Sequence, residues 1–260
     1  MRILLTGKHV PNGPQPIGGV QSWIATVAAE LDRLGHDVTV WGPELGSPSG
    51  RYDLGIMANA EYTRAAFPLC AKTLLVSHGI IAPERPHGAD RYCFTSEGVR
   101  DHWGLNAPIV RQPIDLEFWS DASRKRSGFV RYSYRAGLPW LGAVAAGMGR
   151  TYAHVRNVTH EAARDVLRRA ECVFATGRAA LEAAACGAPV VILDHRSTYQ
   201  GELLAEFGTD QMRNNYSGRG GCQPTTAKVI ELTERAIARG SQRGYVEWFH
   251  DVRNVVGGLL

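Results

Sequence analysis

The sequence predicts an α/β protein in which two halves each contain a parallel β-sheet. Short apolar segments typical of buried strands alternate along the chain with longer segments of helical periodicity, and this alternation is typical of parallel sheets. A glycine-containing turn precedes a helix in each half, near Gly18 and near Gly177. The 260 residues are 44% apolar and 21% charged, which is the composition of a folded protein with a large core.

The charge and the cysteine content argue against several classes of protein. The chain has 29 Lys and Arg against 25 Asp and Glu, a surplus too small to predict a nucleic-acid-binding protein. Its five cysteines form no C-x-x-C pair, so neither a zinc knuckle nor a disulfide framework is indicated. Because we find no signal sequence and no long apolar span, we expect a soluble protein of the cytoplasm.

The first strand is predicted at residues 3–6, and the first helix begins directly after Gly18 and Gly19. Apolar residues of segment 20–34 recur every three or four positions, and Gly35 is a typical residue just beyond a helix. A helix start presents unpaired N–H groups and a positive dipole end, and glycine lets an anion approach them closely. The turn is therefore either a phosphate site or a tight connection that binds nothing. It lacks the G-x-G-x-x-G pattern, which disfavours a dinucleotide site.

His78 is the candidate catalytic residue of the first half. It directly follows a predicted strand, and in parallel sheets ligands bind beyond the carboxyl ends of the strands. A single histidine more often has a structural or surface role, so position alone supports the catalytic interpretation. The further strands of this half are predicted at residues 38–41, 53–57, 73–77, 92–95 and 109–111.

The second half begins with a basic cluster at residues 124–126, which we interpret as a solvated linker. A strand is predicted next at residues 129–134, and Arg131 and Arg135 flank its end. Arginine side chains at this place either hold a diphosphate, for which the planar guanidinium is suited, or lie exposed at the edge of the strand.

A compact strand-helix-strand unit follows. The predicted strand 172–175 leads into Thr176, Gly177 and Arg178, and an alanine-rich helix then precedes a further strand. A cation at a helix start opposes the helix dipole, and a bound anion would reverse that cost. Glu182 lies four residues after Arg178. The two residues either form an ordinary i,i+4 ion pair, or the Glu182 carboxylate accepts two ribose hydroxyls.

Two motifs in this sequence match a known family. The first is the Gly18–Gly19 turn, a helix, and then the pattern G-H-x-V-x-V at residues 35–40; the second is L-E-A-A-A-C-G-A-P-V-V at residues 181–191. They resemble the opening and the donor-site motif of the family-4 retaining glycosyltransferases of the GT-B fold. Weaker matches occur in the family's order at residues 76–79, 94–100 and 113–118.

The resemblance implies two Rossmann-like parallel-sheet domains that face each other across a cleft, with the second domain shortened. We expect an acceptor-side domain at residues 1–120, a nucleotide-sugar domain at residues 121–244, and a C-terminal helix at residues 245–260 that crosses back to the first domain. The resemblance also implies a glycosyltransferase whose donor is a UDP- or GDP-linked sugar. The acceptor stays open between a sugar, a lipid carrier, a protein and modified DNA, and the oligomeric state is open too.

The resemblance further implies roles for individual residues. Gly18 and Gly19 would approach the donor diphosphate, and Glu182 would hold the nucleotide ribose. His78 would line the sugar pocket and take part in catalysis. Retention of the anomeric configuration is implied by the family likeness alone.

Two departures from the family pattern bear on the donor site. The family has a further Glu seven residues before the Glu of the second motif, where this chain has Ala175; Thr176, Gly177 and Arg178 would take its place. The family's diphosphate clamp is matched only loosely by residues 130–137, whose two arginines stay candidates for donor binding.

We expect no metal and no other cofactor, because no D-x-D triplet is present and GT-B enzymes generally stabilise the leaving diphosphate with helix starts and basic side chains. Two alternatives stay open. One is a protein of this fold that binds a nucleotide or a sugar without catalysis, which the loss of the acid at Ala175 favours. The other is a nucleotide-sugar epimerase, which would change the sugar without a second substrate.

Overall fold

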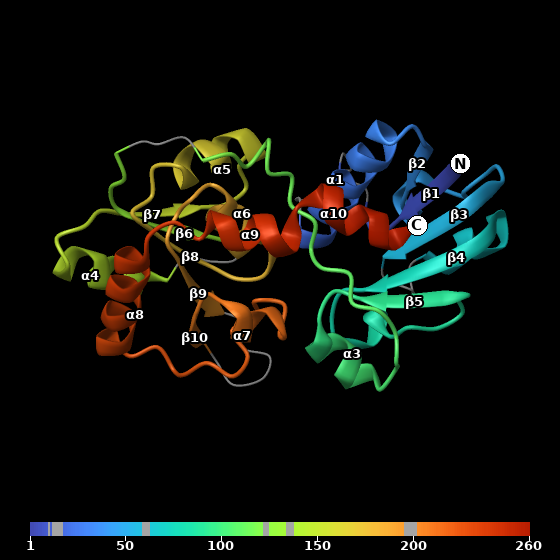
Figure 1. Cartoon of the computed structure of the whole chain (residues 1–260). Coiled ribbons are helices and arrows are strands. Elements are labelled where there is room, and N and C mark those ends of the chain that lie inside the picture. The colour runs from blue at the N-terminus through green and yellow to red at the C-terminus, as the bar shows by residue number, and fades with distance from the viewer. Residues whose placement is uncertain (10, 12–17, 59–62, 122–124, 134–137, 195–201) are drawn as a thin grey trace. The chain divides into compact units, whose positions relative to one another are not determined.

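The computed structural model describes residues 1–9, 11, 18–58, 63–121, 125–133, 138–194 and 202–260. The chain forms two compact units, which we call unit 1 (Met1–Pro113 with His250–Leu260) and unit 2 (Ile114–Phe249). Each unit contains its own five-stranded sheet with helices packed on both faces (Figure 1). Across the described ranges, no helix combines the length and the apolar character that a membrane crossing requires.

The sheet of unit 1 has the strand order β2-β1-β3-β4-β5, and every neighbouring pair is parallel. Parallel strands need crossover connections, and helix α1 supplies the first of these between β1 and β2. The elements of unit 1 are β1 (Arg2–Thr6), α1 (Gly19–Arg33), β2 (Asp37–Trp41), η1 (Pro43–Leu45), β3 (Tyr52–Ala58), η2 (Arg64–Leu69), β4 (Cys70–Ser77), η3 (Ala82–Glu84), β5 (Arg91–Phe94), α3 (Glu97–Trp103), α10 (Val252–Val256) and η4 (Gly257–Leu259).

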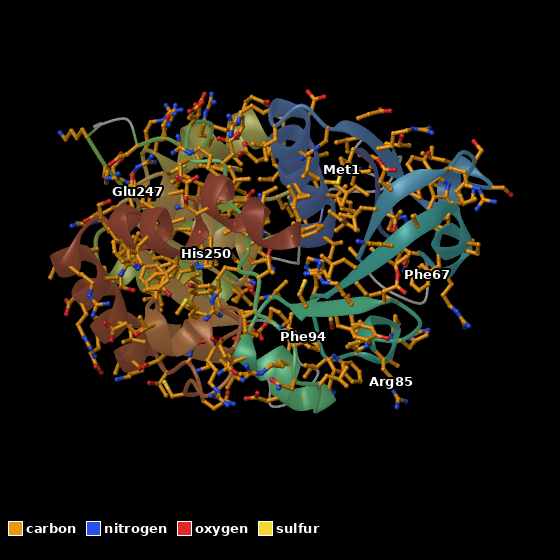
Figure 2. The ribbon with its side chains drawn as sticks, turned by 45° about the vertical axis from the view of Figure 1, so that its right-hand side comes forward. Met1, Phe67, Arg85, Phe94, Glu247 and His250 are labelled. Atoms are coloured by element: carbon orange, nitrogen blue, oxygen red, sulfur yellow. The ribbon has the colours of Figure 1, made fainter. Side chains whose placement is uncertain are left out.

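Side-chain alternation along β1 divides the core of unit 1 into two layers. Ile3 and Leu5 pack with α1 and α10 on one face, whereas Leu4 packs with η2 on the other. The α1 helix lies close to Gly7, the residue that follows β1. A Cβ atom added at Gly7 would lie only 2.4 Å from Cδ1 of the buried Ile24. Phe94 ends the edge strand β5, as Figure 2 shows. The first helix and first strand thus form one tightly packed pair.

The sheet of unit 2 has the order β10-β9-β8-β6-β7, with only the β9–β10 pair antiparallel. Renumbered within the unit, this order is the same as that of unit 1. The elements of unit 2 are β6 (Phe129–Tyr132), α4 (Pro139–Gly147), β7 (Tyr152–Val155), α5 (His160–Leu167), β8 (Cys172–Ala175), α6 (Arg178–Ala185), β9 (Val190–Asp194), β10 (Leu203–Glu206), α7 (Thr209–Met212), α8 (Thr226–Arg239) and α9 (Arg243–His250).

Two apolar layers cover the faces of the second sheet. Val130 lies in the layer of α5, α6 and α9, whereas Phe129 lies in the layer of α4 and α8. Because side chains alternate along a strand, Tyr132 shares the face of Val130 and Arg131 shares the face of Phe129. This alternation decides which of the predicted site residues meet.

The predicted α/β class is confirmed, and the bounds of several segments differ from the sequence-based expectation. Residues 109–111 form no strand, because Ile109 makes only a single parallel bridge to Phe94. The strand predicted at residues 129–134 ends at Tyr132. The C-terminal helix is broken at Asp251, whose carboxylate accepts the backbone N–H of Arg253 at 3.0 Å and so begins α10 as a new helix. Figure 2 labels His250, the last residue of α9, just before this break.

Candidate functional site

The carboxyl ends of β6 and β8 form the candidate site of unit 2. In an open α/β sheet, ligands bind where the strand order reverses, and here that point lies between these two neighbouring strands. Tyr132 is the last residue of β6, and Thr176 and Gly177 connect β8 to α6. Helix α6 packs against β8 and β9 on one face of the sheet. Sequence reasoning placed Thr176, Gly177, Arg178 and Glu182 together, and the structure has all four on this one turn and helix.

The turn before α6 is held in a conformation that favours glycine. Gly177 has φ 58° and ψ −136°, and its backbone N–H donates to the carbonyl oxygen of Tyr216 at 2.8 Å. A Cβ atom there would meet only the Asn215 carbonyl, at an ordinary 3.9 Å. The backbone conformation, rather than the space, therefore requires glycine at this position.

Arg178 and Glu182 form a buried ion pair on the first turns of α6. Nε of Arg178 donates to Oε1 of Glu182 at 2.9 Å, and the two side chains are only 5% and 4% exposed. Burial lowers the pKa of the Arg178 guanidinium, while the Glu182 carboxylate, Tyr132 and Asp115 oppose that effect. The i,i+4 pair considered from the sequence is thus present, and it lies inside the protein rather than on its surface.

Tyr132 is a member of this cluster that sequence reasoning missed. Its hydroxyl donates to Oε2 of Glu182 at 3.1 Å, so the two carboxylate oxygens have partners from two different elements. Burial and the adjacent carboxylate raise the pKa of Tyr132 well above its ordinary value, which keeps the hydroxyl protonated. The only sequence signal was its place within the strand predicted at residues 129–134.

Arg131 lies on the opposite face of β6 from the Arg178–Glu182–Tyr132 cluster, so the structure does not bring it to Glu182. Its side chain is 1% exposed, and among the described residues Nε and Nη2 have no hydrogen-bond partner. Burial lowers the pKa of Arg131, an effect that Tyr152, Glu202 and Asp194 oppose. Arg135, the other arginine predicted here, lies outside the described residues.

A loop after α7 lies against the same edge of the sheet. Asn215 and Tyr216 both have positive φ, 53° and 54°, which is uncommon for residues with a side chain. Gln211 stabilises this conformation, since its amide donates to the Arg219 carbonyl and its oxygen accepts the N–H of Gly218, both at 3.2 Å. The loop thereby holds the Tyr216 carbonyl in place for Gly177.

The first-unit candidates lie at the carboxyl edge of the other sheet. Gly18 is the residue before α1, and its N–H donates to the side-chain oxygen of Gln21 at 2.9 Å, while Gly19 is exposed. His78 directly follows β4, and its ring packs edge to face on the buried Trp23 of α1, with the centroids 4.9 Å apart. Trp23 was not among the predicted site residues. Its contact with His78 packs α1, the helix after the glycine turn, against the end of β4.

Charge is distributed unequally between the units. Unit 2 has 18 Lys and Arg against 14 Asp and Glu, whereas unit 1 has 11 of each. The buried Lys and Arg side chains among the described residues, Arg131 and Arg178, both belong to unit 2. The surplus of four positive charges in the chain therefore lies entirely in unit 2.

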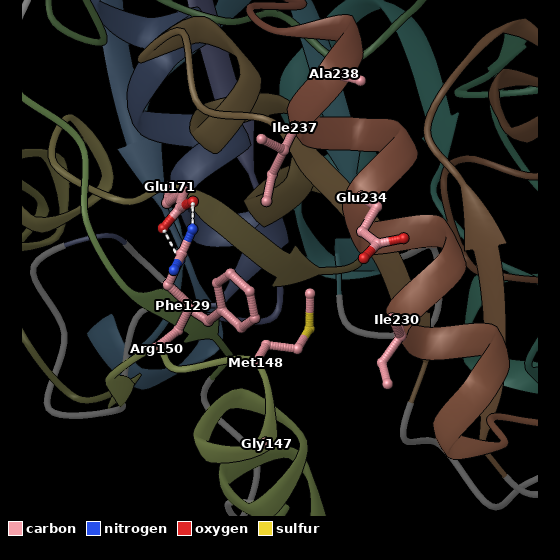
Figure 3. Close-up of a pocket in the computed structure, with 9 residues that line it drawn as sticks. All are labelled: Phe129, Gly147, Met148, Arg150, Glu171, Ile230, Glu234, Ile237 and Ala238. Atoms are coloured by element: carbon pink, nitrogen blue, oxygen red, sulfur yellow. Dashed lines mark hydrogen bonds and ion pairs between the residues drawn. The ribbon is translucent and has the colours of Figure 1, made fainter.

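A pocket of about 520 Å³ lies at the amino ends of β6, β7 and β8, away from the candidate site (Figure 3). Its sides are apolar, and Arg150 and Glu171 form a bidentate ion pair at its rim, at 2.6 and 2.9 Å. None of the predicted site residues lines it. Its lining consists of Phe129, Gly147, Met148, Arg150, Glu171, Ile230, Glu234, Ile237 and Ala238.

No protein-family model matches the chain, and no curated protein matches its sequence. Solved structures do match. AviGT4, described as a glycosyltransferase involved in avilamycin A biosynthesis, is 17% identical, and the match covers 99% of this chain and 95% of that chain with a TM-score of 0.60. Sucrose-phosphate synthase from Thermosynechococcus elongatus is 12% identical, and the match covers 99% and 97% with a TM-score of 0.66. Two mostly parallel sheets of the same strand order, together with these matches over nearly the whole chain, identify the chain as a protein of the GT-B fold.

Proposed function

We propose that this protein is a glycosyltransferase that moves a sugar from a nucleoside-diphosphate sugar to an acceptor. The observation that carries the proposal is the buried Arg178–Glu182–Tyr132 cluster at the point where the strand order of the second sheet reverses. The likeness to solved glycosyltransferase structures, one of them AviGT4, supports the same class of reaction.

In this proposal, unit 2 binds the nucleotide. Glu182 accepts hydrogen bonds from the ribose hydroxyls, since a carboxylate has about four acceptor positions and the described donors occupy two. The diphosphate lies near the start of α6, where backbone N–H groups and the helix dipole favour an anion. Arg131 and Arg178 add positive charge in a water-poor environment, where it acts more strongly than in solvent.

During transfer, the bond between the anomeric carbon and the diphosphate oxygen breaks, the acceptor oxygen forms the new bond to that carbon, and the hydroxyl proton of the acceptor passes to the departing diphosphate. The departing diphosphate gains negative charge, and fixed donors and cations stabilise it in the transition state. We propose His78 for the sugar pocket and Gly18 and Gly19 for the diphosphate. We also propose retention of the anomeric configuration and no requirement for a metal.

The test is incubation of the purified chain with radiolabelled UDP- and GDP-sugars, followed by separation of free nucleotide and sugar. We expect slow hydrolysis of one donor by the wild type. Glu182→Gln should weaken binding of that nucleotide by about tenfold or more, because hydrogen bonds to a charged group are lost. The matched control is Glu231→Gln on α8, a 48% exposed carboxylate outside the cluster, which should leave binding unchanged. Equal effects of both variants would contradict the proposal.

A second candidate is a protein that binds a nucleotide sugar without turning it over. Ala175 favours it, because the last residue of β8 carries no carboxylate at a place where the resembling family has an acid near the donor sugar. Nucleotide binding that Glu182→Gln weakens, together with no release of sugar from any UDP- or GDP-linked donor, would identify this second function.

A further inference from the structure

We infer that Tyr132 is a positioning residue that sets the plane of the Glu182 carboxylate for a vicinal diol of the ligand. The inference rests on the proposed function, since it concerns how the same carboxylate recognises a nucleotide ribose. Tyr132 touches Glu182 and acts through it, at 3.1 Å between the hydroxyl oxygen and Oε2.

The side chain of a glutamate leaves the plane of its carboxylate free. The terminal torsion of Glu is broad and has no sharp minimum, so the side chain itself does not determine the plane of the carboxylate. Within the described residues, Arg178 donates to Oε1 of Glu182 at 2.9 Å, and a bond to this one oxygen leaves rotation of the other oxygen possible. A second contact on Oε2 is needed to set the plane, and Tyr132 supplies it.

The two donors to the Glu182 carboxylate belong to different elements of the fold. Arg178 belongs to the same helix as Glu182, whereas Tyr132 ends the neighbouring strand β6. Donors on a helix and on a strand are held by separate hydrogen-bond ladders, and a tyrosine has only two side-chain torsions. The carboxylate is therefore fixed from two sides by rigid partners. The burial that raises the pKa of Tyr132 keeps its hydroxyl a donor throughout the neutral range.

The Glu182 carboxylate keeps acceptor positions for a ligand. An ionised carboxylate accepts about four hydrogen bonds, and within the described part of the chain only Arg178 and Tyr132 donate to Glu182. One acceptor position is thus left on each oxygen, in one plane. Two neighbouring hydroxyls of a ribose present two donors in a matching arrangement, whereas a single hydroxyl or a deoxyribose does not. Tyr132 thereby contributes to selection of ribonucleotides.

The test is a titration with the nucleoside diphosphate, chosen among UDP, GDP, ADP and CDP, that raises the melting temperature of the wild type most. Tyr132→Phe removes one oxygen atom and should weaken its binding about fivefold, the factor that one hydrogen bond of about 1 kcal/mol represents. The 2′,3′-dideoxy form of the same nucleotide should bind the variant and the wild type equally. A purely structural role would weaken both ligands equally, and that result would overturn the inference.

The matched control is Tyr152→Phe. Tyr152 stands on β7, next to β6 and facing the α4 layer, so the same oxygen is removed on the other side of the sheet. Neither ligand should change its affinity in this variant. A loss of diol selectivity in Tyr152→Phe equal to that in Tyr132→Phe would overturn the inference.

A double-mutant comparison keeps the test decisive if Tyr132→Phe alone does not fold. Because Tyr132 acts only through Glu182, adding Tyr132→Phe to Glu182→Gln should change nucleotide affinity no further. An additional loss would overturn the inference and leave the proposed function standing. Failure of the wild type to bind any of the four nucleotides would overturn the proposed function and this inference with it.

Discussion

The two units of this protein have the same strand order but different chemistry at the edge where ligands bind. In unit 1 that edge has a glycine turn and a half-buried His78, and the unit as a whole has no net charge. In unit 2 it has a buried ion pair and a tyrosine that donates to its carboxylate, and the unit as a whole has 18 of the 29 Lys and Arg residues of the chain. Strand order therefore does not distinguish the units, which differ in the side chains that the same order of strands places at this edge.

The largest test of this difference is removal of one member of the buried ion pair. Arg178→Ala leaves the Glu182 carboxylate buried without its cation and should lower the free energy of unfolding by about 3–5 kcal/mol. Urea denaturation measures this change. The control is Lys228→Ala on α8, whose ion pair with Glu231 is 36% and 48% exposed and should be worth about 0–1 kcal/mol. Similar losses of stability in both variants would mean that the buried ion pair contributes no more to stability than the exposed one.

The two glycine turns provide the next comparison. Gly177→Ala places a side chain at φ 58° and should cost about 1–3 kcal/mol of stability, measured by urea denaturation. Gly18→Ala, at φ −104°, requires only that the flexible Gln21 side chain move, and should cost less than about 0.5 kcal/mol. If Gly18 nevertheless contacts the diphosphate, Gly18→Ala will weaken nucleotide binding without weakening the fold. Equal losses of stability in Gly177→Ala and Gly18→Ala would mean that the backbone conformation of the two turns does not decide where glycine is required.

The sequence was sufficient to predict the β8–α6–β9 segment almost to the residue. Cys172 to Ala175 are uniformly apolar, and Gly177 and Gly187 bound an alanine-rich helix, so strand, turn and helix are each indicated locally. The pairing of Tyr132 with Glu182 could not be predicted in the same way. The two residues are fifty positions apart, and only the pairing of β6 with β8 brings them together.

Edge elements were the other features that local patterns missed. β7 is four residues long and contains the polar Tyr152 and His154, so it shows no run of apolar residues. Residues 109–111 are the reverse case: their apolar pair predicted a strand, but the structure has only a single bridge there. Whether a short segment extends a sheet depends on the neighbour it meets, and that information is not local.

The smallest expected effect concerns His154, which lies beside the buried Arg131 in the register of β6 and β7. Burial lowers the pKa of His154, the neighbouring Arg131 and Arg156 lower it further, and its hydrogen bond to the Ser133 carbonyl opposes them. Because the folded pKa lies below the unfolded value of about 6.5, the unfolded chain takes up this proton first as the pH falls. The contribution of His154 to stability is therefore complete above that pH and decreases below it.

Urea denaturation between pH 7.5 and pH 5 measures this contribution, and NMR titration of the imidazole gives the pKa directly. In His154→Asn the loss of stability on acidification should be smaller than in the wild type. An imidazole that titrates at or above pH 6.5 would mean that burial and the positive charge of Arg131 do not disfavour the protonated form of His154. In that case only the ion pair and Tyr132 would distinguish the ligand-binding edge of unit 2 from that of unit 1.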